Sequence, residues 1–163
     1  MAPLSINETT IMIPERKFMK AKEKVSAMDA QETRWLINPA GSEVIYESMK
    51  FSQAVQVGNI VWISGQVGMD ENFKIGVGVE AQARRAFLNL KHVLQTAGGS
   101  LSDIVELITY HTSMQDMQAF GKVKGEFIPE NFPAWTAVGV TALVLPELLL
   151  EIRATAFIDR VDK

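Results

Sequence analysis

Apolar residues recur every three or four positions in the stretch from residue 79 to residue 97. The repeating positions are Ala83, Phe87, Leu90, Leu94 and Ala97. This spacing places them on one face of an α-helix, because a helix completes a turn every 3.6 residues. The Gly98-Gly99 pair that follows is a typical helix stop. The pattern therefore predicts a helix over residues 79–97 with one buried face.

A second helical stripe begins after Asp116. Its apolar positions are Met117, Phe120, Val123 and Phe127. Asp116 is well placed to cap the first turn, because its carboxylate can accept hydrogen bonds from the free backbone N–H groups there. Pro129 and Pro133 end the segment, since proline lacks the N–H that a continuing helix needs. The sequence thus predicts a second, shorter helix between Asp116 and Pro129.

The other apolar segments are rich in β-branched residues and alternate with polar ones, which is typical of strands. The predicted strands cover residues 51–57, 60–64, 104–114, 135–143 and 148–158, with a further short strand as an option near residues 74–77. Gly58 and Asn59 separate the first two strands, and both residue types tolerate the positive φ angles of a two-residue hairpin turn.

The order of these elements is two strands, a helix, a strand, a helix and two strands. Strand pairs followed by long helices indicate an α/β domain of the α+β kind, with a mixed sheet and both helices on one face. The second face of the sheet must also be buried. Packing against copies of the same chain is the natural solution, so the pattern predicts a homo-oligomer.

Residues 1–34 differ from the rest, which we expect to form one domain over residues 35–163. The segment is charged and has few apolar anchors. A helix is expected over residues 15–34, although its apolar stripe is thin. That stripe consists of Phe18, Ala21, Val25 and Met28. Two interpretations stay open, namely a partly helical or flexible arm in solvent, and an arm that packs on a neighbouring subunit.

Composition and charge narrow the classes of function. Hydrophobic residues make up 47% of the chain and charged residues 21%, as in soluble globular proteins, and 163 residues suffice for one domain. No apolar run approaches the ~20 residues that a membrane span needs, so no membrane partner is expected. The net charge is −3, with no basic block outside the N-terminal arm, which gives no support for a nucleic-acid partner.

The chain contains no cysteine. This excludes disulfides, thiolate catalysis and cysteine-based metal sites. Its two histidines are far apart and have no HExxH spacing, so we expect neither a metal nor another cofactor. Residues 1–20 lack the apolar core of a secretory signal. Together these features are compatible with a reducing cytoplasm, which is the expected location.

Several segments, in order along about three quarters of the chain, resemble the RidA/YjgF family of reactive intermediate imine deaminases. They are Ile37-Asn-Pro, Phe51-Ser-Gln-Ala-Val-Gln-Val-Gly-Asn, Ile63-Ser-Gly-Gln-Val, Ala81-Gln-Ala-Arg-Arg-Ala-Phe-Leu-Asn-Leu, Phe132-Pro-Ala-Trp-Thr-Ala-Val-Gly-Val and Leu150-Glu-Ile-Arg-Ala-Thr-Ala. The resemblance implies a chorismate-mutase-like fold that forms a homotrimer with a barrel-like core. It also implies small-molecule pockets in the clefts between subunits, and cofactor-independent hydrolysis of 2-imino or enamine acids.

The chain departs from the family pattern at three positions. The signature arginine that holds the substrate carboxylate is replaced by Trp135, and an indole cannot form a bidentate clamp. The family tyrosine of the entry strand is Phe51, which lacks the hydroxyl. The family asparagine of the second helix corresponds to Lys124, which offers a cation instead. The chain is therefore a divergent member for which the usual 2-imino acid activity is in doubt.

Other elements of the family pocket are kept. Glu151 falls on the family's pocket glutamate and interrupts an apolar strand, where a carboxylate is costly unless it is paired. Its alternative role is a structural salt bridge, for example with Arg153 of another subunit. Ser64, Gly65 and Gln66 keep the Ser-Gly-Gln turn, whose backbone N–H groups and hydroxyl could hold an oxyanion or water.

Four further residues have both a functional and a structural interpretation. Trp135 is either a pocket wall for a flat ligand or a core or interface anchor. His111 is either a general base, suited to neutral pH, or a satisfied strand histidine. Lys124 and Arg153 are either replacement cations or ordinary solvated side chains.

Two functions follow from these residues. The first is a Rid-like hydrolase of a small imine, enamine or related C–N bond, in which Glu151 manages protons and the Ser-Gly-Gln turn positions water. Trp135 and Phe51 would then wall the pocket, with His111 as a second candidate base. The second is a non-catalytic trimer that binds or senses a small molecule. Loss of the arginine and tyrosine favours the second function, and retention of Glu151 favours the first.

Overall fold

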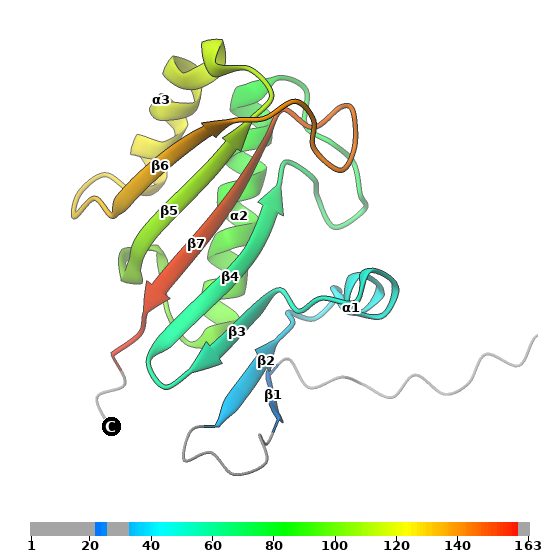
Figure 1. Cartoon of the computed structure of the whole chain (residues 1–163), viewed down its shortest axis with the longest axis vertical. Helices are drawn as coiled ribbons and strands as arrows, with labels where there is room; N and C mark the ends of the chain where they lie inside the picture. Colours follow the sequence, from blue (N-terminus) through cyan, green and yellow to red (C-terminus); the bar gives the residue numbers. More distant parts are fainter. Residues whose placement is uncertain (1–21, 26–32, 160–163) are drawn as a thin grey trace, which may run out of the picture.

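The computed structural model describes residues 22–25 and 33–159, and these residues form one seven-stranded sheet flanked by helices (Figure 1). The strands are β1 (Lys22–Val25), β2 (Arg34–Ile37), β3 (Ala54–Val57), β4 (Ile60–Val67), β5 (Ile104–His111), β6 (Ala134–Gly139) and β7 (Leu150–Phe157). Their order in the sheet is β1-β2-β3-β4-β7-β5-β6. Only β5 and β6 are parallel neighbours among these strands, so the predicted mixed sheet is confirmed.

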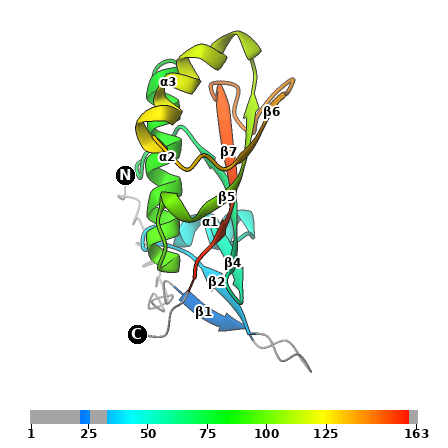
Figure 2. The same cartoon turned by 90° about the vertical axis from the view of Figure 1, so that its left-hand side faces the viewer.

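Helices α2 (Val79–Ala97) and α3 (Met117–Phe127) both lie on one face of the sheet (Figure 2). Both helices were predicted, and α2 ends where Gly98 adopts a φ of +92°. The Phe87 ring of α2 stacks on Phe120 and Phe127 of α3, with ring centroids 5.9 and 5.1 Å apart. Asp116 does occupy the cap position of α3, but its side chain makes no capping hydrogen bond.

The hairpin of β3 and β4 is also confirmed. Val57 pairs with Ile60, and Gly58 has the positive φ of +55° that the two-residue turn requires. The other predicted strands end earlier than expected, at His111, at Gly139 and at Phe157. Residues 74–77 form no strand, since Ile75 makes only an isolated bridge to Met69.

The helix predicted over residues 15–34 is wrong where the structure describes it. Lys22–Val25 form strand β1, which pairs antiparallel with β2 through Lys22–Ile37 and Val25–Arg34. Without β1, one edge of β2 would present unpaired backbone groups. The hydrogen bonds that β1 makes there stabilise the strand more than a thin apolar stripe stabilises a helix. The remainder of the predicted helix lies outside the described residues.

Helix α1 (Glu43–Met49) was not predicted, because it is only seven residues long, too short for a repeating apolar pattern, and none of its residues is buried. It follows β2 and precedes β3 in the chain, and it lies to one side of these two paired strands (Figure 1). Its last turn ends at Lys50, which has left-handed backbone angles of φ +59° and ψ +38°.

The two faces of the sheet differ in burial. Leu150, Ile152, Ala154 and Ala156 of β7 belong to the core beneath α2 and α3. The alternate residues of β7 therefore lie on the opposite face, together with Trp62, which is 40% exposed. Neither α2 nor α3 covers this second face (Figure 2). Among the helices of the described ranges, none is both long and apolar enough to cross a membrane.

Candidate active site

A bulge in β4 shapes the first part of the candidate site. Ile63 pairs with Ala154 and Gln66 pairs with Ile152, so Ser64 and Gly65 together oppose the single residue Arg153. Such a bulge bends the strand and redirects the side chains beside it. The predicted Ser-Gly-Gln turn is therefore an irregularity within a strand, next to the start of β7.

The side chain of Glu151 crosses this bulge. A Cβ placed on Gly65 would overlap the Oε1 atom of Glu151, so the carboxylate lies directly against the Gly65 backbone. Only glycine leaves that space. Glu151 is on the face opposite the helices, because its neighbours Leu150 and Ile152 belong to the core.

Burial raises the pKa of the Glu151 carboxyl above its ordinary value. The carboxylate is half-buried, and within the described residues it has neither a hydrogen bond nor an ion pair. Arg153 lies on the same face, two residues along β7, without pairing with it. An unpaired carboxyl with a raised pKa holds a proton more readily than an ordinary glutamate does, which suits it to accept and return one.

Buried side-chain amides hold the Ser-Gly-Gln turn in place from the interior of the protein. Gln66 Nε2 donates to Gln53 Oε1 and to the Ser64 carbonyl oxygen, at 3.0 Å in each case. The Gln53 backbone N–H in turn donates to Asn38 Oδ1 at 3.0 Å. Gln53 and Gln66 are buried, at 7% and 5% exposure. Gln66 therefore supports the turn from inside the protein, while its predicted contact with a ligand stays a prediction.

The Ser64 hydroxyl donates to the Ser52 carbonyl oxygen at 2.7 Å. The hydroxyl proton of Ser64 is therefore already used in a hydrogen bond. The hydroxyl oxygen can still accept a hydrogen bond from water or a ligand. Asn38 and Gln53 were missed as supporting residues, although both lie within motifs that carried the family resemblance. Polar residues in such motifs give no signal in sequence that they will be buried.

Phe51 lines a pocket of about 420 Å³ beside this turn. The lining residues are Leu36, Tyr46, Glu47, Lys50, Phe51 and Ser52. Ser52 is the residue whose carbonyl binds Ser64, so the pocket adjoins the turn. Sequence reasoning missed Tyr46, Glu47 and Lys50 because it missed α1.

Trp135 lies on the other face of the sheet, on the edge strand β6. Its Nε1–H donates to Thr109 Oγ1 at 3.0 Å, and its ring centroid is 5.9 Å from that of Phe120 in α3. The Lys124 ammonium is 4.6 Å from the Trp135 ring centroid and 5.4 Å from that of Phe132, which is a cation–π arrangement. Trp135 is 39% exposed, so part of the indole is open to a ligand or a partner.

His111 is fully buried behind this tryptophan. Its Nε2 is 2.9 Å from Thr109 Oγ1, its ring meets Phe120 edge-on, and its Nδ1 has no partner within the described chain. Thr109 Oγ1 also accepts from Trp135 Nε1–H, so the Thr109 hydroxyl lies between the two rings. Burial lowers the pKa of His111, and Asp116 opposes this to a lesser extent.

One protomer therefore presents the predicted residues as two groups on opposite faces. The glutamate group consists of Ser64, Gly65 and Glu151, with Phe51 beside it, and the tryptophan group consists of Thr109, His111, Lys124 and Trp135. The alternation of β5 shows the separation, because Tyr110 pairs with Glu151 whereas His111 pairs with Leu150. The structure thus does not bring His111 to Glu151 within one chain.

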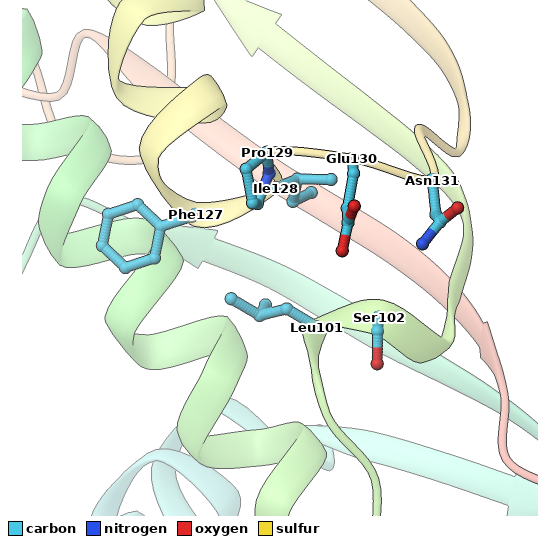
Figure 3. Close-up of a pocket in the computed structure, with 7 residues that line it drawn as sticks. All are labelled: Leu101, Ser102, Phe127, Ile128, Pro129, Glu130 and Asn131. Carbon is cyan, nitrogen blue, oxygen red and sulfur yellow. The ribbon is translucent and has the colours of Figure 1, made fainter.

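A second pocket, of about 220 Å³, contains none of the predicted site residues (Figure 3). It lies between the turn before β5, with Leu101 and Ser102, and residues 127–131 at the end of α3 and just beyond it. Over the described part of the chain, no group of three or more His, Asp or Glu side chains could hold a metal ion.

Comparison with known proteins places this chain in a family. The family model described as Endoribonuclease L-PSP matches residues 42–158. The chain is 39% identical over 95 residues to a 2-iminobutanoate/2-iminopropanoate deaminase of Dermatophagoides farinae, covering 57% of this chain and 74% of that protein. It is 37% identical over 107 residues to the 3-aminoacrylate deaminase RutC of Acinetobacter baylyi, covering 64% and 84%.

Among solved structures, protein YJGH superposes with a TM-score of 0.70 at 32% identity, covering 77% of this chain and 96% of that one. The fold, a mixed sheet with two helices on one face, matches that of this solved structure. The chain belongs to the RidA/YjgF family, so the resemblance drawn from its motifs is confirmed.

Proposed function

We propose that this protein is a cofactor-independent hydrolase that releases ammonia from small imines or enamines. The observation that carries the proposal is the unpaired, half-buried Glu151 carboxyl lying against Gly65 in the β4 bulge. Support also comes from relatives whose names specify imine and 3-aminoacrylate deamination.

The active site would form between subunits of a homotrimer. In one protomer the glutamate group and the tryptophan group face opposite ways, so each could meet its counterpart only on a neighbouring copy. The sheet face opposite α2 and α3 exposes apolar side chains, including Trp62 at 40% and Phe157 at 48%. Packing three such faces together would bury them and would give a barrel-like core.

The chemistry needs one proton carrier and one water. The Glu151 carboxylate removes a proton from water as the water oxygen bonds to the carbon of a protonated imine, and the C=N bond becomes a C–N single bond. The resulting carbinolamine nitrogen then takes that proton from Glu151 and leaves as ammonia. As the C–N bond breaks, the hydroxyl oxygen forms the carbonyl and releases its proton to Glu151, and the departing ammonia takes up that proton as ammonium. Water bound at Ser64 and the turn would be held in line for the attack.

Trp135 and Phe51 would determine which substrates the proposed hydrolase prefers. Without the signature arginine, the carboxylate of a small 2-imino acid loses a charge-assisted contact worth roughly 1.5–3 kcal/mol. Indole and phenyl faces favour flat ligands instead. Larger and flatter imines should therefore be better substrates than small aliphatic 2-imino acids.

The second candidate is a non-catalytic trimer that binds a small molecule. Two replacements favour it, since Trp135 and Phe51 stand where the family has an arginine and a tyrosine. RNA cleavage, which the description of the family model names, has no electrostatic support in a chain with a net charge of −3. The absence of cysteine suits a role in the cytoplasm.

Ammonia release separates the two candidates. Imines generated in situ by an amino-acid oxidase would be supplied from a panel of amino acids, with imine hydrolysis without protein as the baseline. A hydrolase accelerates ammonia release and loses this activity in Glu151→Gln. A binding protein leaves the rate at the baseline for every imine in the panel.

A further inference from the structure

The pocket beside the glutamate group is lined by both apolar and polar side chains. It is an open hollow of about 420 Å³, which is large enough for part of a small organic molecule. Leu36 and Phe51 supply apolar walls, whereas Tyr46, Glu47 and Lys50 supply a phenol, a carboxylate and an ammonium. The three polar residues all come from α1 and its last turn.

Packing does not explain α1. None of its residues is buried, so the helix adds little to the hydrophobic core. Within the described residues, the Tyr46 hydroxyl has no hydrogen bond and the Lys50 ammonium has no ion pair. These two groups are therefore available to a ligand.

The backbone conformation of Lys50 also indicates a role for its side chain. Lys50 closes α1 with φ +59°, and its N–H donates to the Tyr46 carbonyl oxygen at 3.1 Å. Glycine or asparagine adopts this left-handed conformation more readily than lysine does. A lysine held in a conformation that it disfavours suggests that its side chain has a use.

The pocket also adjoins the proposed reaction centre. Phe51 and Ser52 line it, and the Ser52 carbonyl oxygen binds the Ser64 hydroxyl at 2.7 Å. A ligand in the pocket could therefore extend past Ser64 toward Glu151.

We propose that this pocket binds the substrate through a single carboxylate, held by Lys50 and Tyr46, with a flat apolar body against Phe51. Lys50 would supply the positive charge that Trp135 cannot supply, and Tyr46 the hydroxyl that Phe51 lacks. Glu47 at the same pocket would repel a second negative charge, so the ligand is a monoanion. The proposal rests on the proposed function and specifies its substrate class as aromatic or similarly flat monocarboxylic imines and enamines.

Binding tests this without requiring turnover. The probe is phenylpyruvate, the 2-oxo acid that hydrolysis of such an imine would yield, with pyruvate and uncharged phenylacetone as comparisons. Calorimetry would be run on the full chain and on Lys50→Gly, Lys50→Arg and Tyr46→Phe. Lys91→Ala, which removes an exposed lysine from α2, is the matched control for charge.

We expect phenylpyruvate to bind more tightly than either comparison ligand. Lys50→Gly should weaken it about tenfold or more, as loss of a charge-assisted contact does. Lys50→Arg should keep most of the affinity, Tyr46→Phe should weaken it less than Lys50→Gly does, and Lys91→Ala should change nothing. Melting temperature separates function from folding, because glycine at position 50 should leave it unchanged or higher.

Equal affinity of Lys50→Gly and the wild type, or of phenylacetone and phenylpyruvate, would overturn the proposal. So would the absence of measurable phenylpyruvate binding. Ammonia release distinguishes this failure from failure of the proposed function. If the wild type hydrolyses imines but Lys50→Gly changes neither KM nor phenylpyruvate affinity, the pocket assignment alone is wrong. If the binding results hold but no imine is hydrolysed, the pocket stands and the hydrolase is wrong.

Discussion

The Glu151 carboxylate and the Gly65 backbone are in direct contact across β7 and the bulge of β4, and no side chain fits between them. This contact fixes the carboxylate beside the Ser64 turn. The contact also makes glycine a requirement at position 65, although the φ angle there is not positive and so does not itself require glycine.

Gly65→Ala should therefore displace Glu151. We expect only a small loss in the free energy of unfolding, because the flexible Glu151 side chain can move aside. We also expect roughly a hundredfold loss in kcat, since a misplacement of about 1 Å has effects of that size. Denaturant unfolding and ammonia release measure the two effects. Gly121→Ala in α3 is the matched control, because a Cβ there meets nothing within 4 Å. A fully active Gly65→Ala variant would show that the contact is unimportant.

His111 should make stability depend on pH. Burial lowers its pKa in the folded state below its ordinary value of 6.5. As pH falls below 6.5, the unfolded chain takes up a proton at His111 that the folded chain refuses. The free energy of unfolding then falls by up to about 1.4 kcal/mol per pH unit, until the lowered pKa is reached.

Chemical denaturation between pH 7 and pH 5 measures this slope. His111→Gln should make the slope shallower than that of the matched variant His92→Gln, which removes an exposed histidine of α2. Identical slopes for the wild type and His111→Gln would mean that His111 already titrates normally in the folded protein.

Replacing the tryptophan should change specificity. Trp135→Arg restores the family's cation and should raise the residual rate on small aliphatic 2-imino acids. The gain is limited because the new guanidinium would lie beside the Lys124 ammonium, which now packs on the indole ring at 4.6 Å. Trp135→Arg combined with Lys124→Asn removes that repulsion and should gain about tenfold over the wild type. The measurement is ammonia release from the imine of alanine. A wild type that already hydrolyses this imine faster than that of phenylalanine would contradict the prediction.

The assembly should be a homotrimer in solution. Ile108 lies on the open face of the sheet, opposite Arg153 in the register of β5 and β7. Ile108→Lys would place a second positive charge there and should yield monomers with little or no activity. Leu88→Lys, on the exposed side of α2, should leave the trimer intact. Light scattering at micromolar concentration decides, and a monomeric wild type would be incompatible with a site between subunits.

How far the sequence predicts this structure depends on the range of the interactions involved. Helix α2 was predicted with its bounds because its apolar stripe and its terminal glycine are local signals. Helix α1 gives no such signal, since it is too short for a repeating apolar pattern. Strand β1 was mistaken for helix because its stability comes from pairing with β2, which the local pattern does not record.

The candidate site divides in the same way. Motifs and the family resemblance named Glu151, Ser64 and Gly65 as candidates, but they gave no sign of the bulge that brings the carboxylate onto the glycine. The buried support from Asn38 and Gln53 was missed because isolated polar residues are usually exposed. Tyr46 and Lys50 were missed together with α1.

The central claim is that Glu151 carries the proton in imine hydrolysis. Its direct test is the rate of ammonia release as a function of pH for the wild type and Glu151→Gln, with the phenylalanine imine as substrate. Burial raises the pKa of Glu151, so the wild-type rate should fall as pH drops through a value above the ordinary 4.5 of a glutamate, because the carboxylate base is lost. Glu151→Gln should lose at least a hundredfold in rate, the usual scale for a general acid–base group, and this pH dependence with it. A Glu151→Gln variant that keeps the wild-type rate and pH profile would contradict the account.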